Sequence, residues 1–150
     1  MKSLMKTAAF VFIAIGFAGA LQSCTKEDTK TLRSKSYSMT TVNSSGVSGT
    51  VTFNENSDNT TDVKVHMMGT INGLQYPMHI HSGPITSPGA VVFDLGTPAS
   101  SGGMIDNTVK VSQAYDYMIN YNGCFVAHDP QAADPLTTYV LVGNVGSNAP

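Results

Sequence analysis

The sequence predicts an all-β domain, an antiparallel Greek-key sandwich or barrel, behind an N-terminal signal. Short β-type runs, some with alternating apolar and polar residues, recur across residues 37–142, and clusters of Gly, Asn, Asp, Ser and Pro separate them. No stretch keeps a 3.6-residue apolar period long enough to predict a helix. Many short strands divided by turn residues are typical of sandwiches and barrels.

The start of the 150-residue chain has the layout of a secretory signal peptide. A basic segment, residues 1–6, precedes an almost unbroken apolar run over residues 7–21, which is too short to span a membrane comfortably. We expect cleavage to remove residues 1–23. Residues 24–36 are then a flexible polar tether, and residues 37–150 are long enough for one domain with its own core.

Cys24 stands at the end of the apolar run, in a Leu-Gln-Ser-Cys sequence that resembles the lipobox of bacterial lipoproteins. The resemblance implies that Cys24 is acylated and becomes the first residue of the mature chain; a plain thiol after an ordinary signal is the alternative. Lys26, Glu27 and Asp28 follow and are similar to the export tag of surface lipoproteins. We therefore expect an outer-membrane lipoprotein, exposed at the cell surface, with the lipid on Cys24 as its membrane contact.

Charge and thiol content argue against nucleic-acid binding and against an intrachain disulfide. Loss of Lys2 and Lys6 leaves 6 basic residues against 10 acidic ones, a net charge of −4 without a basic patch, so nucleic acid is not an expected partner. With Cys24 acylated, Cys124 is the one remaining thiol, and no intrachain disulfide can form. The sequence does not identify a protein or glycan partner.

The strands follow from short β-type runs, of which residues 47–53 and 63–68 alternate apolar and polar side chains. We expect them at residues 37–42, 47–53, 63–68, around 79–81, 90–95, 108–111, 117–121, 124–128 and 137–142. Asn122-Gly123 predicts a tight hairpin turn between the two strands beside it. The predicted core includes Phe53, Val65, Ile71, Leu74, Ile80, Val91 and Phe93.

His79 and His81 predict a metal site. In a strand, residues two apart point to the same face, so the two imidazoles project together while Met78 and Ile80 point toward the core. Neutral imidazole suits both copper and zinc. His128, at the end of another strand, is the best candidate for a third ligand. The alternative is that all three are ordinary surface histidines.

Other residues could contribute to metal binding but have simpler interpretations. His66 alternates with the apolar residues of its strand and is expected to face solvent. Met67, Met68 and Met78 could suggest a soft Cu(I) site, although Met67 and Met78 fall on the core face, where Met is ordinary filler. Asp129 could orient the neighbouring histidine or begin the turn at the following proline; the turn is the preferred interpretation.

Four motifs occur in an order that resembles the copper/zinc superoxide dismutase fold and the chordin-type (CHRD) domain. They are Gly49-Thr-Val-Thr-Phe53, Gly69-Thr-Ile-Asn-Gly-Leu74, His79-Ile-His-Ser-Gly83 and Phe125-Val-Ala-His-Asp129. The resemblance covers residues 47–145. It implies a dismutase-like sandwich in which His79, His81 and His128 take the places of three copper ligands.

The departures from the dismutases are equally specific. No histidine lies between His81 and His128, so the bridging ligand and the zinc histidines have no counterparts. Tyr139 and Val142 stand where the dismutases carry an Arg and a Cys, and Arg33 falls in the predicted tether. We therefore expect a CHRD-like module that binds one copper or zinc ion and is not an enzyme. A mononuclear copper dismutase and a metal-free structural module are the alternatives.

Overall fold

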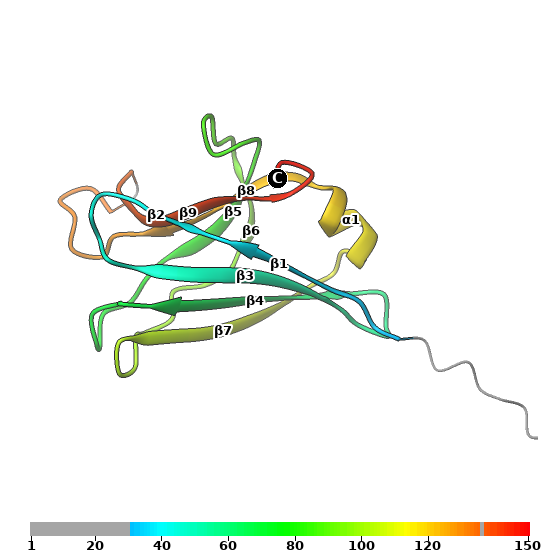
Figure 1. The fold of residues 1–150 in the computed structure, drawn as a ribbon, viewed down its shortest axis with the longest axis horizontal. Coiled ribbons are helices and arrows are strands. Elements are labelled where there is room, and N and C mark those ends of the chain that lie inside the picture. Colours follow the sequence, from blue (N-terminus) through cyan, green and yellow to red (C-terminus); the bar gives the residue numbers. More distant parts are fainter. Residues whose placement is uncertain (1–30, 136) are drawn as a thin grey trace, which may run out of the picture. The chain divides into compact units, whose positions relative to one another are not determined.

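The computed structural model describes residues 31–135 and 137–150. Cys24 and the tag at residues 26–28 lie outside them. Two antiparallel sheets enclose one apolar core, which confirms the predicted β-sandwich (Figure 1). No helix within the described part of the chain combines the length and apolar character needed to cross a membrane.

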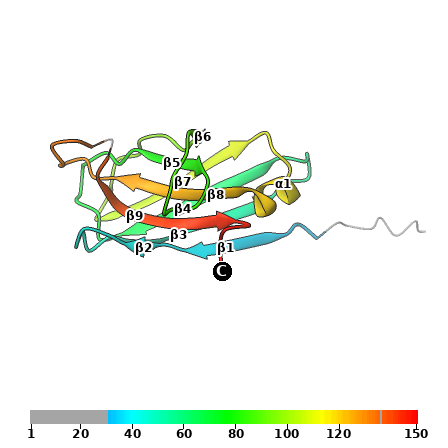
Figure 2. The same cartoon turned by 90° about the horizontal axis from the view of Figure 1, so that it is seen from above.

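Within the described residues, the two sheets are built from nine strands that pair only in antiparallel fashion. The first sheet has, in spatial order, β1 (Ser34–Ser38), β3 (Ser48–Glu55), β4 (Thr61–Met68) and β7 (Met104–Val111). The second has β2 (Thr40–Thr41), β9 (Tyr139–Gly146), β8 (Asn122–His128), β5 (Met78–Ser82) and β6 (Val91–Asp94). The chain changes sheets after β1, β2, β4, β6 and β7. As a result β7 pairs with β4, and β8 pairs with β5 (Figure 2). These are the crossings expected of a Greek key.

The core follows the two-residue period of the strands. In β4, Val63, Val65 and Met67 are fully buried, whereas Lys64 and Met68 between and after them are exposed. In the facing sheet β5 alternates in the same way, whereas β8 is buried at every position after Asn122. The predicted inward face of residues 63–68 is thereby confirmed.

Part of the predicted core is wrong. Phe53, Val65, Ile80 and Phe93 are buried as expected, and Leu74 is partly buried against the core. Two predicted core residues, Ile71 and Val91, are about half exposed. Ile71 lies in the turn after β4, and Val91 begins β6 at the edge of its sheet. Neither side chain is therefore covered by the facing sheet.

The expected strand at residues 117–121 is instead mostly helix. Helix α1 spans Tyr115–Asn120 and buries Tyr115 and Met118, which are three residues apart and therefore share one helical face. The expected Asn122-Gly123 turn is also wrong, since both residues begin β8. A Cβ at Gly123 would lie 2.7 Å from Cδ1 of Tyr121, so glycine serves here to allow close packing rather than a turn.

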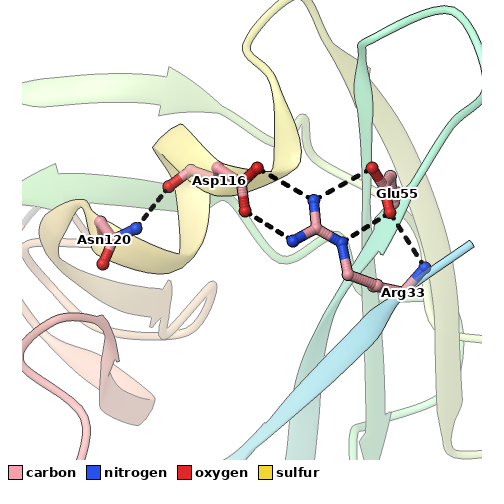
Figure 3. A network of polar contacts seen from close by, with 4 residues as sticks. All are labelled: Arg33, Glu55, Asp116 and Asn120. Carbon is pink, nitrogen blue, oxygen red and sulfur yellow. Dashed lines mark hydrogen bonds and ion pairs between the residues drawn. The ribbon is translucent and has the colours of Figure 1, made fainter.

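Arg33 belongs to the fold rather than to the tether, and β1 begins at Ser34, earlier than the expected domain start at Tyr37. Figure 3 shows the Arg33 guanidinium between two carboxylates. It donates from Nε and Nη2 to Glu55 at 2.8 and 3.0 Å, and from Nη1 and Nη2 to Asp116 at 2.7 and 3.0 Å. The side chain thus connects the start of β1 to the end of β3 and to α1.

Candidate metal centre

Strand alternation and register bring the three histidines to one face of the second sheet. His79 and His81 project from the outer face of β5, because the residues between and before them are buried in the core. His79 is directly opposite Val126 of β8, and His128 lies two residues further along that strand. A residue at this diagonal position on the same face is within reach of an imidazole.

The distances between the ring nitrogens fit a shared metal ion. His79 Nδ1 lies 3.2 Å from His128 Nε2, and one ring nitrogen from each of the three histidines lies within 4.8 Å of the others. Two ligands of a tetrahedral zinc ion, each 2.0–2.1 Å from the metal, are about 3.3 Å apart. The structure therefore brings together all three predicted residues in an arrangement that could hold a metal ion.

Two backbone carbonyls orient two of the rings. His128 Nδ1 lies 2.7 Å from the carbonyl oxygen of Pro135, and His81 Nδ1 lies 2.9 Å from that of Gly89. A carbonyl can only accept, so each Nδ1 carries the proton and each Nε2 presents a lone pair. Ligating histidines are commonly fixed in this way through their second nitrogen.

Sequence reasoning did not find these two carbonyls. Gly89 and Pro135 end two segments that contain turn residues, residues 82–89 and 130–135, and this composition was their only signal. A backbone oxygen carries no side-chain identity that a sequence pattern could reveal. Asp129, the side chain considered for this role, instead accepts from the Gln131 amide at 2.9 Å, as expected of a turn.

The free nitrogen of His81 is the most informative atom of the site. His81 Nε2 is buried and has no hydrogen-bond partner among the described residues. Leaving a buried polar atom unsatisfied costs about 1–3 kcal/mol, and such atoms in folded proteins call for a specific explanation. A metal ion shared with His79 and His128 would satisfy this lone pair.

Bulges and a covering loop shape the surroundings. The β5–β6 register shifts at His81 and the β8–β9 register shifts at His128, and such bulges re-aim side chains. The loop after β5 crosses over β8, because the amide of Ile85 donates to Oδ1 of Asn144 on β9 at 2.8 Å. This loop carries the Gly89 carbonyl to His81.

Gly89 lies where two backbone segments approach closely. A Cβ there would collide with Oγ of Ser82 in its present rotamer and lie 3.1 Å from the Ser82 carbonyl oxygen, to which the Gly89 amide donates at 2.7 Å. The close approach of these two backbone segments places the Gly89 carbonyl where His81 Nδ1 can reach it.

Burial favours the neutral form of His79 and of His128. Burial is the main cause that holds the pKa of His79 and that of His128 below the ordinary value; the proximity of His128 adds to the effect on His79, and Asp94 opposes it. Asp94 Oδ1 lies 3.7 Å from His79 Nε2. The His79 side chain is 20% exposed whereas His128 is 3% exposed, so solvent reaches the site from the His79 side. Neutral imidazole is the form that binds metal.

His66 takes no part in this cluster. It lies on β4 of the first sheet, where its Nδ1 is 2.9 Å from Asp106 Oδ1, and its side chain is partly exposed as expected. The ring that packs on His128 is instead that of Tyr139, with 5.1 Å between ring centroids.

The arrangement supplies three nitrogen ligands and leaves room for more. Among the described residues, no other His, Cys, Asp or Glu joins the three-histidine cluster. A zinc or copper ion there would retain a position for water or another small ligand. No protein-family model and no curated protein matches this chain.

Proposed function

We propose that the protein is an exported lipoprotein whose CHRD-like β-sandwich binds one copper or zinc ion through His79 Nδ1, His81 Nε2 and His128 Nε2. The observation that carries the proposal is the buried, unpartnered Nε2 of His81 beside two other imidazole nitrogens. Bound zinc would supply a Lewis acid, and bound copper a redox-active ion. The protein's own contribution is to bring three imidazoles together and to orient those of His81 and His128 through the carbonyls of Gly89 and Pro135.

A hydrogen-bonded, metal-free trio is the competing arrangement. His79 Nδ1–H could donate to His128 Nε2 across their 3.2 Å separation. That bond would satisfy two of the rings, but it would leave the buried Nε2 of His81 without a partner. A metal ion satisfies all three lone pairs, which is why we favour it.

Superoxide dismutation is the second candidate, supported by the open coordination position. Efficient dismutation also needs a positive field that attracts the anion. Arg33, the one arginine of the chain, has its guanidinium engaged by Glu55 and Asp116, and the expected mature chain is acidic. We therefore propose metal binding rather than efficient dismutation.

Metal binding is tested by thermal unfolding of the full-length protein in detergent, with and without Zn²⁺ or Cu²⁺. Because the native site alone binds the ion, free metal at a hundred times Kd should stabilise the fold by about 2.7 kcal/mol and raise its Tm. His79→Ala, His81→Ala and His128→Ala should each abolish the rise. His66→Ala, the matched control on the other sheet, should retain it.

Metal analysis of the same samples should give one ion per chain. A Tm rise that survives all three site substitutions, or that His66→Ala abolishes as well, would contradict the proposed site. A superoxide assay on the copper-loaded protein decides the second candidate: rapid turnover that His79→Ala abolishes would establish dismutation.

The anchor is proposed from the sequence and needs its own test. Cys24→Ala should abolish palmitate incorporation and release the protein from membranes, because no other acyl acceptor is expected after cleavage. Replacing Lys26, Glu27 and Asp28 together with Ala should protect the protein from protease added to intact cells. Labelled palmitate that still enters Cys24→Ala, or unchanged protease access in the triple variant, would refute the corresponding part of the proposal.

A further inference from the structure

Two exposed methionines face each other on the outer surface of the first sheet. Met68 ends β4 and Met104 begins β7, and the register pairs them directly. Their side chains are 46% and 47% exposed, in contrast to Met67, Met78 and Met118, which are fully buried in the core. Residues opposite each other on neighbouring strands have Cβ atoms about 4.5–5.5 Å apart. The two flexible thioethers can therefore reach a common point.

A histidine lies on the same face, one rung along the sheet. His66 precedes Met68 by two residues and pairs with Asp106, just as Met68 pairs with Met104. His66 Nδ1 lies 2.9 Å from Asp106 Oδ1, and an ionised carboxylate can only accept, so Nδ1 carries the proton. His66 Nε2 then has a free lone pair, and the carboxylate fixes the ring as it does for many metal-binding histidines.

The turn beside the methionines adds an apolar border. Ile71 follows β4 and is about half exposed. The Thr70 amide donates to the Gly103 carbonyl at 3.2 Å, which holds the turn that carries Ile71 against the one that leads into Met104. An apolar border limits water around a bound ion and favours one that is weakly hydrated.

We propose that Met68, Met104 and His66 form a second metal site, which binds a soft monovalent cation such as Cu(I). Thioethers are soft ligands that select Cu(I), while zinc and Cu(II) prefer the all-imidazole set on the other sheet. The proposal concerns binding alone and involves no redox step. It does not depend on the three-histidine site, because the two sites lie on different sheets and share no ligand.

An exposed apolar patch without metal affinity is the alternative explanation for the methionine pair. Substituting leucine separates the two, since leucine keeps the apolar volume but lacks the sulfur. At exposed positions this change should leave the fold intact. Met39, which is partly buried at the core rather than on this face, provides the matched control.

The experiment titrates the full-length protein in detergent and chloride-free buffer with Ag(I), a redox-inert substitute for Cu(I). Methionine ε-methyl resonances report the binding position by position, which distinguishes this site from thiol binding at Cys124. We expect the resonances of Met68 and Met104 to shift together and to saturate at one Ag(I) per site. Met39→Leu should leave these shifts unchanged, and His66→Ala should weaken the binding about tenfold or more.

Calorimetric titration then isolates the contribution of sulfur. Met68→Leu with Met104→Leu should remove the site's Ag(I) binding, whereas unchanged Ag(I) affinity in this double variant would overturn the proposal. Unchanged affinity in His66→Ala would remove the imidazole from the proposed ligand set. His79→Ala should leave the Ag(I) shifts intact, so a failure of the three-histidine site is read separately from a failure of this one.

Discussion

At the scale of single residues, position decides burial more than polarity does. Phe53 and Ile71 are both large and apolar, and the sequence pattern predicts both in the core. Phe53 is fully buried between the sheets and packs edge-on against Tyr37, with ring centroids 5.1 Å apart. Ile71 lies half exposed in a turn. Their substitutions should therefore have very different costs.

Phe53→Ala should lower the free energy of unfolding by about 3–5 kcal/mol, because it removes transfer energy and leaves a cavity. Ile71→Ala should change it by less than about 0.5 kcal/mol, as is usual for a surface position. Urea denaturation of the two variants and the parent measures both values. Equal losses would show that Ile71 is buried in solution.

The histidines illustrate the same point for polar residues. His79 and His66 are both strand residues with one ring nitrogen near an acidic side chain. Only His79 has two other imidazoles nearby, and those come from its own strand and from a residue far along the chain, His128. A histidine's chemistry is thus set by what the fold places around it.

At the scale of elements, side chains in turns hold neighbouring strands together. Asp58 lies in the turn between β3 and β4, where it accepts from the Thr60 hydroxyl, and its Oδ2 lies 2.9 Å from Lys110 Nζ on β7. The pKa of Asp58 is lowered from 3.8 to about 2. The hydrogen bond from Thr60 is the largest cause, and the interaction with the Lys110 ammonium is the next. The carboxylate therefore connects the hairpin to the next strand of the sheet.

This lowered pKa predicts a pH dependence. Because the folded-state pKa of Asp58 is below its unfolded value, the unfolded chain binds more protons between about pH 2 and pH 4. The stabilisation by Asp58 is fully present above about pH 4 and is lost as pH falls toward 2. Asp58→Asn should therefore be less stable than the parent at neutral pH, and the difference should shrink over this range in urea titrations at successive pH values.

Lys110→Met is the control, because it removes the weaker of the two causes of the lowered Asp58 pKa. This variant should retain part of the pH-dependent stability. The effect is modest because both charged groups are largely exposed and salt screens them. Parallel stability curves for the parent and Asp58→Asn from pH 5 to pH 2 would show that the carboxylate contributes no pH-dependent stability.

Helix α1 shows why element type can be misjudged from a short run. Residues 117–121 form a short, mostly apolar run like those of the strands, yet Tyr115 and Met118 bury one helical face. Arg33 then connects α1 to β3 through Asp116 and Glu55 (Figure 3). A six-residue helix depends on such tertiary contacts, because an isolated one of this length is not stable in water.

At the scale of the whole molecule, the sequence by itself determined the fold class and the shared face of two of the three candidate ligands. Its two-residue apolar period and its turn residues predict a sandwich, because alternation and turn chemistry are local properties of the chain. The same local rule places His79 and His81 on one face, and it places Met67 inside and leaves Met68 outside.

Only the tertiary structure decided which distant residues meet. It set the register that puts His128 diagonal to His79, the loops that bring the carbonyls of Gly89 and Pro135 to the rings, and the pairing of Met68 with Met104. Local periodicity determines which face a side chain occupies, but it carries no information on the residue opposite. That choice depends on strand register and on the crossings between sheets, which are fixed by contacts between residues far apart in the chain.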